Sequence, residues 1–592
     1  MGTASDFDFY QLSKKIARGL WNKMRMKIHF NHTNRTGYAL LLVMAFVGVS
    51  MVIVTGALNW ASNNSLLIQR NNQYFTASAA AEAATEKVLA QMNYDFLTQG
   101  AAVVAANMSS YQTLVPTIAE NEAWSRFSFR DGGGNPNATT VTNCLPWGYT
   151  SLQSQYTGLN AWAATYRVVS SARELNTRHN VKAAVQQEFQ IANIPIFQFA
   201  IYYSMDLEIN PGPNMNITGR VHGNSTIYTQ PQATLTFQSD VTAVGNIIQA
   251  KSPLDPLART SGTVTFQKEH DSGVASLNLP IGTNNSPAAV RAILEVPPVS
   301  EDPNSIIGKQ RFYNKSDLIV LVSNSTVRVM SGLFNNFATT IPAAQYTNFL
   351  QTNVSFFNTR EAKTVKTTQL DVAKLRTWSQ TNTTLSLGRD VRAIYIADLR
   401  SQTSGTESGV RIVNGQTLPS MGLTVTTPNP LYVKGHFNAP SAYLGTTNTT
   451  GTLPSALIGD SINVLSVNWN DANSTLALGS RNADDTTVNA AFLGGIVPSN
   501  GTYYSGGVEN FPRFLEDWSG ETFTYNGSMV VMFYSQISTG PWLGTGTTYN
   551  IYNAPTRNWT FDLNFLDPTK LPPGTPELRK LVRGQWSLVK AN

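Results

Sequence analysis

The sequence has 592 residues, with 42 Lys and Arg against 36 Asp and Glu, a formal net charge of +6. Residues 1–37 account for +5 of this charge, through seven cations and two acids: Lys14, Lys15, Arg18, Lys23, Arg25, Lys27 and Arg35 against Asp6 and Asp8. The remainder is close to neutral, which argues against a nucleic-acid partner. Only 13% of residues are charged, while Asn, Thr, Ser and Gly are plentiful, a mixture typical of β-structure with many turns.

The first predicted element is a membrane-spanning helix from Tyr38 to Leu58. These 21 residues carry no charge and reach about 32 Å as a helix, the thickness of a bilayer's hydrocarbon core. Apart from Tyr38, the only hydroxyls belong to Ser50 and Thr55, which a helix can satisfy with its own carbonyls. A buried core helix is the alternative, but such helices usually carry a polar stripe.

The flanking charges predict the orientation of this helix. The basic segment precedes it, and the next Lys or Arg is Arg70, so the N-terminus is expected in the cytoplasm and the bulk of the chain outside it. A cleaved secretory signal fits less well, because its apolar region is shorter and ends in a small-residue cleavage site.

Helix-forming residues continue after the span. The stretch from Leu66 to Phe96 is rich in Ala, with Glu82, Glu86 and Lys87 on a wet face, and no Pro or Gly occurs between Leu58 and Gly100. The sequence therefore predicts one continuous helical rod from Tyr38 to about Met92.

The basic leader ending in Gly37, the uncharged helix and the "AAAEAATEKVLAQM" continuation together resemble the N-terminus of type IV pilin-like proteins, in particular PilX-type minor pilins. The resemblance covers Arg35 to about Met92. It implies cleavage after Gly37 by a prepilin peptidase, methylation of Tyr38, residence in a bacterial inner membrane and packing against other pilin-like subunits through the helix. The periplasm or the cell surface would then hold the rest of the chain.

Two departures qualify this resemblance. The leader is unusually long, and Leu42, the fifth residue after the cleavage point, stands where major pilins carry a glutamate. In lacking this glutamate the chain resembles minor subunits located at a filament tip, such as the large K-type pseudopilin of type II secretion. The alternative is a plain single-span membrane protein whose leader is not cut.

The expected fold class is mainly β, α+β as a whole: a long N-terminal transmembrane helix followed by a β-rich ectodomain with a part like a parallel β-helix or solenoid. Six segments are expected: a leader (1–37), the helix (38–96), a small α+β head (97–194), a first solenoid part (195–250), an insertion with linkers and a helix (251–418), and a second solenoid part with a C-terminal cap (419–592).

Patterns within these segments carry the prediction. Trp162 to Glu174 and Asn180 to Ile194 alternate as half-buried strands do. Similar fragments, "NITGRVHGN" at Asn216 and "LYVKGHFNA" at Leu431, suggest stacked repeats; a β-sandwich is the alternative. Thr359 to Gln380 has a helical period.

Catalytic chemistry is sparse in this sequence. The one local acid–base cluster is Glu269–His270–Asp271, which reads as a solvated turn, while His222 and His436 hold matching places in the two similar fragments. Cys144, the only cysteine, is either a buried small hydrophobic side chain or a thiol that is reactive or pairs with another molecule. No catalytic, cofactor or metal site is predicted, and the ectodomain's surface ligand is not identified.

Two function classes follow from these observations. The first is a structural subunit of a type IV pilus or related secretion system, with a tip, adhesion or assembly role. The second is a membrane-tethered solenoid enzyme or binding protein for carbohydrate.

Overall fold

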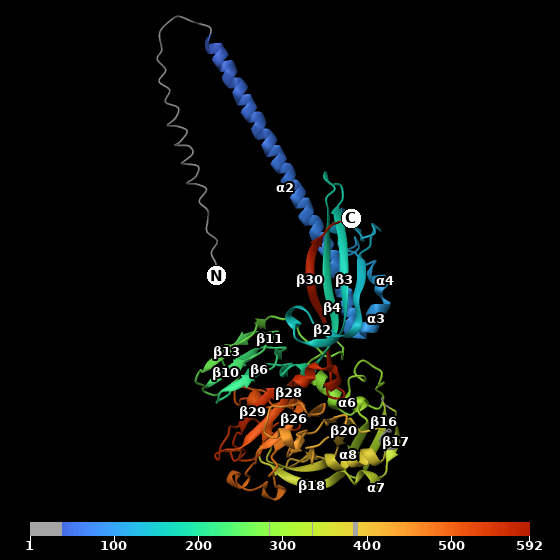
Figure 1. The fold of residues 1–592 in the computed structure, drawn as a ribbon, viewed down its shortest axis with the longest axis vertical. Coiled ribbons are helices and arrows are strands. Elements are labelled where there is room, and N and C mark those ends of the chain that lie inside the picture. Colours follow the sequence, from blue (N-terminus) through green and yellow to red (C-terminus); the bar gives the residue numbers. More distant parts are fainter. Residues whose placement is uncertain (1–37, 283, 334–335, 383–388, 592) are drawn as a thin grey trace. The chain divides into compact units, whose positions relative to one another are not determined.

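The computed structural model describes residues 38–282, 284–333, 336–382 and 389–591 (Figure 1). The chain divides into two compact units, Met1–Phe75 and Thr76–Asn592. Helix α2, Tyr38–Gln99, begins in the first unit and ends in the second. The prediction of one long helix starting at Tyr38 is confirmed, and the helix runs seven residues past Met92. The leader, including Gly37, lies outside the described residues.

The helix ends where Gly100 takes a left-handed conformation, with φ at 94°. Its backbone N–H donates to the carbonyls of Asp95 (3.2 Å) and Phe96 (3.0 Å), which satisfies acceptors of the last turn. Two short helices follow, α3 (Ala101–Ala106) and α4 (Met108–Tyr111).

The second half of α2 packs on a five-stranded antiparallel sheet. The strand order is β1-β3-β4-β30, with β2 also paired to β3. The strands are β1 (Phe127–Arg130), β2 (Thr140–Ser151), β3 (Asn160–Glu174), β4 (Lys182–Pro195) and β30 (Glu577–Val589). β3 and β4 match the two alternating segments, so these predictions are confirmed.

The fifth strand of this sheet corrects an expectation. β30 belongs to the segment predicted as a C-terminal cap, yet it pairs antiparallel with β4, from Glu577 opposite Pro195 to Val589 opposite Ala184. A pairing between residues 382 to 405 positions apart leaves no local sign in the sequence, because the alternation within each strand does not depend on which strand it pairs with.

After the head, ten short strands form three parallel ladders, and every third strand returns to the same ladder. Ile201 pairs with Val221, which pairs with Val241, so each of the first two passes takes 20 residues. The first ladder contains β5 (Ile201–Tyr203), β8 (Val221–Gly223), β11 (Val241–Ala243) and β14 (His270–Ser272). The second contains β6 (Leu207–Ile209), β9 (Ile227–Thr229) and β12 (Ile247–Ile248). The third contains β7 (Met215–Ile217), β10 (Thr234–Phe237) and β13 (Thr263–Phe266).

The following strands divide between two large sheets. A 13-stranded sheet continues the first ladder through β5 and β28. It adds β15 (Leu318–Val322), β16 (Val327–Leu333), β17 (Asn336–Ile341), β20 (Ala393–Asp398), β22 (Leu423–Thr426), β24 (Ser455–Gly459), β26 (Thr486–Ile496), β28 (Thr522–Tyr534) and β29 (Thr556–Phe561). A six-stranded sheet contains β18 (Leu350–Asn358), β19 (Lys363–Asp371), β21 (Thr406–Val413), β23 (Leu431–Lys434), β25 (Ile462–Leu465) and β27 (Arg513–Phe514).

This topology corrects the predicted insertion. Segment 251–418 supplies β20 and β21, which pair in parallel with β22 and β23 of the following segment, so it is part of both sheets. The linkers predicted in this segment therefore do not separate it from the rest of the fold. Along the chain from β20 to β28 the strands alternate between the two sheets.

The helix predicted over Thr359 to Gln380 is half right. Strand β19 occupies Lys363–Asp371, and α8 covers only Val372–Thr381. Asp371 caps the helix by accepting a hydrogen bond from the Lys374 backbone N–H at 3.0 Å. Residues Lys363–Asp371 form a strand and not a helix because β19 pairs along both of its edges, with β18 and β21. The described residues also form the short α-helices α5 (Pro287–Arg291), α6 (Phe312–Lys315) and α7 (Ala343–Tyr346).

Candidate functional site

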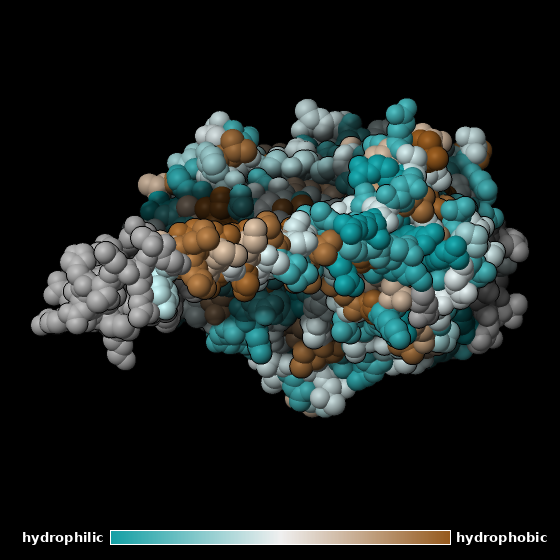
Figure 2. Space-filling view, turned by 90° about the horizontal axis from the view of Figure 1, so that it is seen from above, coloured by the Kyte–Doolittle hydropathy of each residue, from teal (hydrophilic) through white to brown (hydrophobic). Residues whose placement is uncertain are grey.

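The predicted membrane span is the first part of α2. Every residue from Tyr38 to Leu58 is exposed, with Tyr38 63% and Leu58 65% accessible. Figure 2 shows apolar side chains of this region in brown. Within the described part of the chain, α2 is the one helix long and apolar enough to cross a membrane. An uncharged helix with its whole circumference exposed needs an apolar surrounding, which a bilayer or neighbouring helices supply.

Polar side chains in the span are few. Thr55 donates its hydroxyl to the Met51 carbonyl at 2.7 Å, as predicted. A shallow hollow of about 380 Å³ runs along one helix face, lined by residues three and four apart: Val43, Phe46, Val47, Ser50, Met51 and Val54. Such a hollow suits an apolar knob from a lipid chain or another helix.

The end of the span is marked by Trp60, which is 69% exposed, and by the polar run Asn59 to Ser65. Tryptophan is enriched where a spanning helix meets the headgroup region. The next charged residue is Arg70.

The second part of α2 is a docking helix. Its buried positions recur every three or four residues: Ala77, Ala80, Ala81, Ala84, Thr85, Val88, Leu89, Met92, Asp95 and Phe96. The alanines let the helix backbone approach the sheet closely, while Val88, Leu89, Met92 and Phe96 form one core cluster with Tyr166, Phe189 and Ile191 of β3 and β4.

Two arginines on β30 tie the end of the chain to α2. Arg579 donates from Nη1 to the carbonyls of Phe96 (3.2 Å) and Leu97 (3.1 Å), in the last turn of the helix. Arg583 forks to both carboxylate oxygens of Glu86, at 2.5 and 2.7 Å, and this hydrogen bonding lowers the pKa of Glu86. Sequence reasoning missed these residues, although Arg579 and Arg583 are spaced to share one face of a strand.

A buried carboxylate sits in the same helix end. Asp95 accepts hydrogen bonds from the Tyr111 hydroxyl at 2.6 Å and from Gln91 Nε2 at 2.9 Å. Burial, together with the hydrogen bond to Asp95, raises the pKa of Tyr111. The pair fixes α4 against α2.

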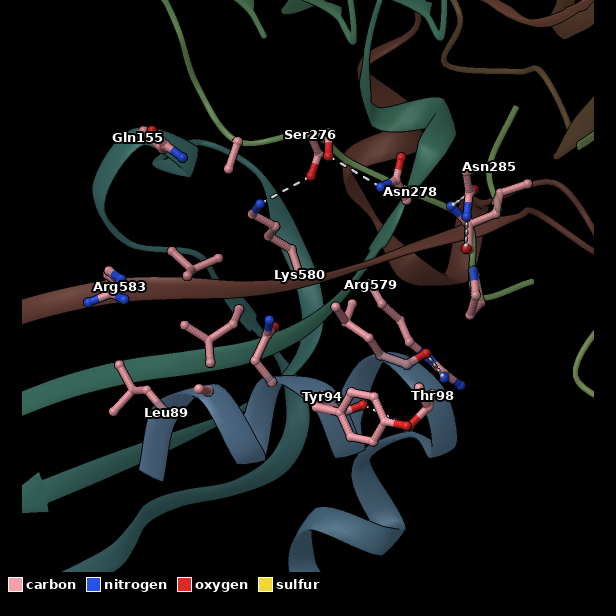
Figure 3. A pocket seen from close by; sticks show the side chains of 18 of the residues that line it. Leu89, Tyr94, Thr98, Gln155, Ser276, Asn278, Asn285, Arg579, Lys580 and Arg583 are labelled. Carbon is pink, nitrogen blue, oxygen red and sulfur yellow. Dashed lines mark hydrogen bonds between the residues drawn. The ribbon is translucent and has the colours of Figure 1, made fainter. Parts of the chain in front are cut away.

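A cleft of about 860 Å³ opens between α2, β30 and the residues 275–282 and 285 (Figure 3). Leu89, Tyr94 and Leu97 line its helix side. Its strand side carries Arg579, Lys580 and Arg583, and Lys580 Nζ donates to the Ser276 carbonyl at 3.1 Å. Burial lowers the pKa of Lys580 to about 8.

His222 and His436, which the sequence places in similar fragments, lie at strands of different sheets and have different hydrogen-bond partners. His222, on β8, is fully buried; its ring nitrogens lie 2.8 Å from Thr242 Oγ1 and 3.0 Å from Asn224 Oδ1, and burial lowers its pKa to about 4. His436 follows β23 in the other sheet and accepts from the Thr487 backbone N–H at 3.1 Å. The two similar fragments therefore lie in different sheets and do not stack on each other as repeats.

The cluster Glu269–His270–Asp271 is exposed at the start of β14, beside a wide polar groove of about 1000 Å³. The His270 ring stacks on Phe266 at 4.3 Å. Cys144 is half-buried on β2 as a free thiol. Among the described residues, no group of three or more His, Cys, Asp or Glu side chains has an arrangement that could hold a metal ion.

No protein-family model and no curated protein matches the sequence. Among solved structures, the competence-associated pilin ComZ from Thermus thermophilus is similar over 86% of this chain and 97% of its own, with 10% identity and a TM-score of 0.27. At that TM-score the likeness carries no argument about fold or function.

Proposed function

We propose that this protein is a membrane-anchored, pilin-like structural subunit of a type IV pilus or a related secretion or assembly system. The observation that carries the proposal is the single helix α2, which is uncharged and exposed from Tyr38 to Leu58 and buries its second half on an antiparallel sheet. One continuous helix thus offers an anchoring half and a docking half, as a subunit assembled through its N-terminus requires.

The proposal places the leader in the cytoplasm and the second unit in the periplasm or on the cell surface. The charge pattern supports this orientation, because +5 precedes the span and no Lys or Arg follows until Arg70. A prepilin peptidase would cut after Gly37 and leave Tyr38 as the methylated first residue. The mature helix would then leave the inner membrane to pack among other subunits.

The finer assignment is a PilX-type or other minor subunit at a filament tip, because Leu42 lacks the carboxylate that would meet a neighbouring N-terminus. We assign the parallel ladders to a β-helix-like solenoid: the 20-residue passes from Ile201 to Val221 and Val241 support this, as do the strands alternating between two sheets. The solenoid would serve adhesion or assembly, and the proposal assigns it no catalysis, cofactor or metal.

The test is the N-terminus of the mature protein. Expressed in cells with a prepilin peptidase, the wild-type chain should begin at Tyr38 with an added methyl group, read by mass spectrometry of the N-terminal peptide. Gly37→Val should retain the leader, because the added side chain obstructs close approach to the scissile backbone. The +5 charge would then hold the helix in the membrane.

Gly48→Val is the matched control, since a Cβ at Gly48 meets no heavy atom within 4 Å and the substitution lies inside the span. Its processing should equal that of the wild type. A wild-type protein that starts at Met1 or Gly2 would refute the proposed cleavage and leave an uncut membrane anchor.

A further inference from the structure

β30 is an edge strand of the five-stranded sheet that packs on α2. Among the described strands, β4 is the one that pairs along it, and the sheet order ends at β30. Its outer edge has a single bridge, in which the Arg579 backbone N–H donates to the Asn278 carbonyl at 3.2 Å. An edge strand that remains open presents backbone donors and acceptors to an incoming chain.

The bridge defines which backbone groups face outward. In an antiparallel pair, alternate residues direct their N–H and C=O groups to the same side. Because the N–H of Arg579 points away from β4, the backbone groups of Leu581 and Arg583 also point away, into the cleft described above. Asn278 therefore pairs with the outer edge of β30 at Arg579 only. No described strand pairs with the outward backbone groups of Leu581 and Arg583.

The two sides of this edge differ in chemistry. On the α2 side lie Leu89, Ala90 and Tyr94, of which Tyr94 is 60% exposed. The Arg579 and Arg583 guanidinium groups lie on this side too, and their hydrogen bonds to α2 already occupy them (Figure 3). On the opposite face of β30, Lys580 places its ammonium against the Ser276 carbonyl.

The charges of the cleft are unbalanced. The cleft lining holds three cations, Arg579, Lys580 and Arg583, and one carboxylate, Glu86, a formal sum of +2. Glu86 lies on the α2 face with Arg583, whereas Lys580 lies on the opposite face of β30. Glu86 is already bound by Arg583, and the buried Nε of Arg579 has no hydrogen-bond partner. A half-buried ammonium whose named acceptor is one carbonyl favours an added carboxylate.

We propose that β30 receives an extended segment of a partner protein as an added strand, with apolar side chains toward α2 and acidic side chains toward Lys580. Strand addition gives affinity through backbone hydrogen bonds and specificity through alternate side chains. The inference rests on the second unit alone and does not depend on the pilin-like assignment.

The probe is an acetylated, amidated eight-residue peptide that alternates Val and Glu, labelled for fluorescence anisotropy with the full chain in detergent micelles. We expect saturable binding. A peptide with Lys in place of Glu should bind at least tenfold more weakly, and so should a Val–Glu peptide whose backbone is N-methylated at alternate residues. Hydrogen exchange should show slower exchange at the amides of Leu581 and Arg583 when the first peptide is bound.

Two variants test the location. Ala90→Trp fills the cleft from an exposed helix position, and Lys580→Gln removes the cation on the face of β30 away from α2; each should weaken binding at least fivefold. Lys366→Gln, an exposed cation on β19, is the matched control and should bind as the wild type does. Far-UV circular dichroism checks that each variant is folded, and Lys580→Gln keeps the test decisive if Ala90→Trp does not fold.

Three results would overturn the proposal. Equal affinity for the N-methylated and parent peptides would show that charge alone, without strand pairing, accounts for binding. Unchanged affinity in Lys580→Gln would place the acidic side chains elsewhere, and absence of saturable binding would leave β30 a closed edge.

Discussion

Phe96→Ala tests whether α2 is held by the head in the way the contacts indicate. Phe96 is 0% exposed, belongs to the core cluster between α2 and β3–β4, and lies 6.3 Å from the Trp147 ring between centroids. The Arg579 guanidinium, which holds the last carbonyls of α2, stands 5.8 Å from the same ring. Truncating a fully buried phenylalanine costs about 3–5 kcal/mol through lost burial and the cavity left behind. We expect a loss within this range in the free energy of unfolding.

The assay is urea unfolding of the full chain in detergent micelles, followed by tryptophan fluorescence and by far-UV circular dichroism. Tyr94→Ala is the matched control: it lies on the same turn of α2 but is 60% exposed, so its effect should stay within about 0.5 kcal/mol. If Phe96→Ala lowers the free energy of unfolding by less than about 1 kcal/mol, the helix is not held by this cluster and the reasoning is refuted.

Two further predictions concern the span and a buried acid. Val47→Arg places a charge in the middle of the span at a cost of about 2.5–3.5 kcal/mol, so a membrane-insertion assay should show less insertion, whereas Val47→Leu should match the wild type; equal insertion of both would contradict the span. Glu509 is 4% exposed, and burial raises its pKa from 4.5 to about 7. The folded protein therefore binds the Glu509 proton more tightly than the unfolded chain does. The stability that the protonated Glu509 contributes is fully present below pH 4.5 and is lost as the pH rises through 7, a loss of at most about 3 kcal/mol. Glu509→Gln should make the free energy of unfolding fall less steeply between pH 5 and 8, and an unchanged slope would count against the buried titration.

The elements that sequence reasoning found are those whose signal is local. The α2 helix follows from an uncharged run and an alanine-rich continuation without Pro or Gly, although it ends at Gln99 and not near Met92 as expected. Strands β3 and β4 follow from alternation that belongs to each strand alone. Each of these depends on a period that neighbouring residues set, so no distant part of the chain is needed to see it.

The cleft could not be predicted in this way. It needs β30 beside α2, which brings Arg583 within 2.5 Å of Glu86 across 497 positions of sequence. No pattern among the charged residues of β30 identifies Glu86 as their partner. The edge is open because β30 is the last strand of the five-stranded sheet.

The sequence by itself determined the long N-terminal helix: an uncharged run of 21 residues beginning at Tyr38 that fits a membrane anchor, with a basic leader before it and a helix-forming continuation after it. Only the tertiary structure decided that residues from segment 251–418 complete both large sheets, that β19 replaces half of a predicted helix, and that β30 returns to the head. The physical reason is that helix hydrogen bonds join residues four apart, whereas strand pairs are chosen by the whole fold, so a strand's partner is a property of the assembled chain.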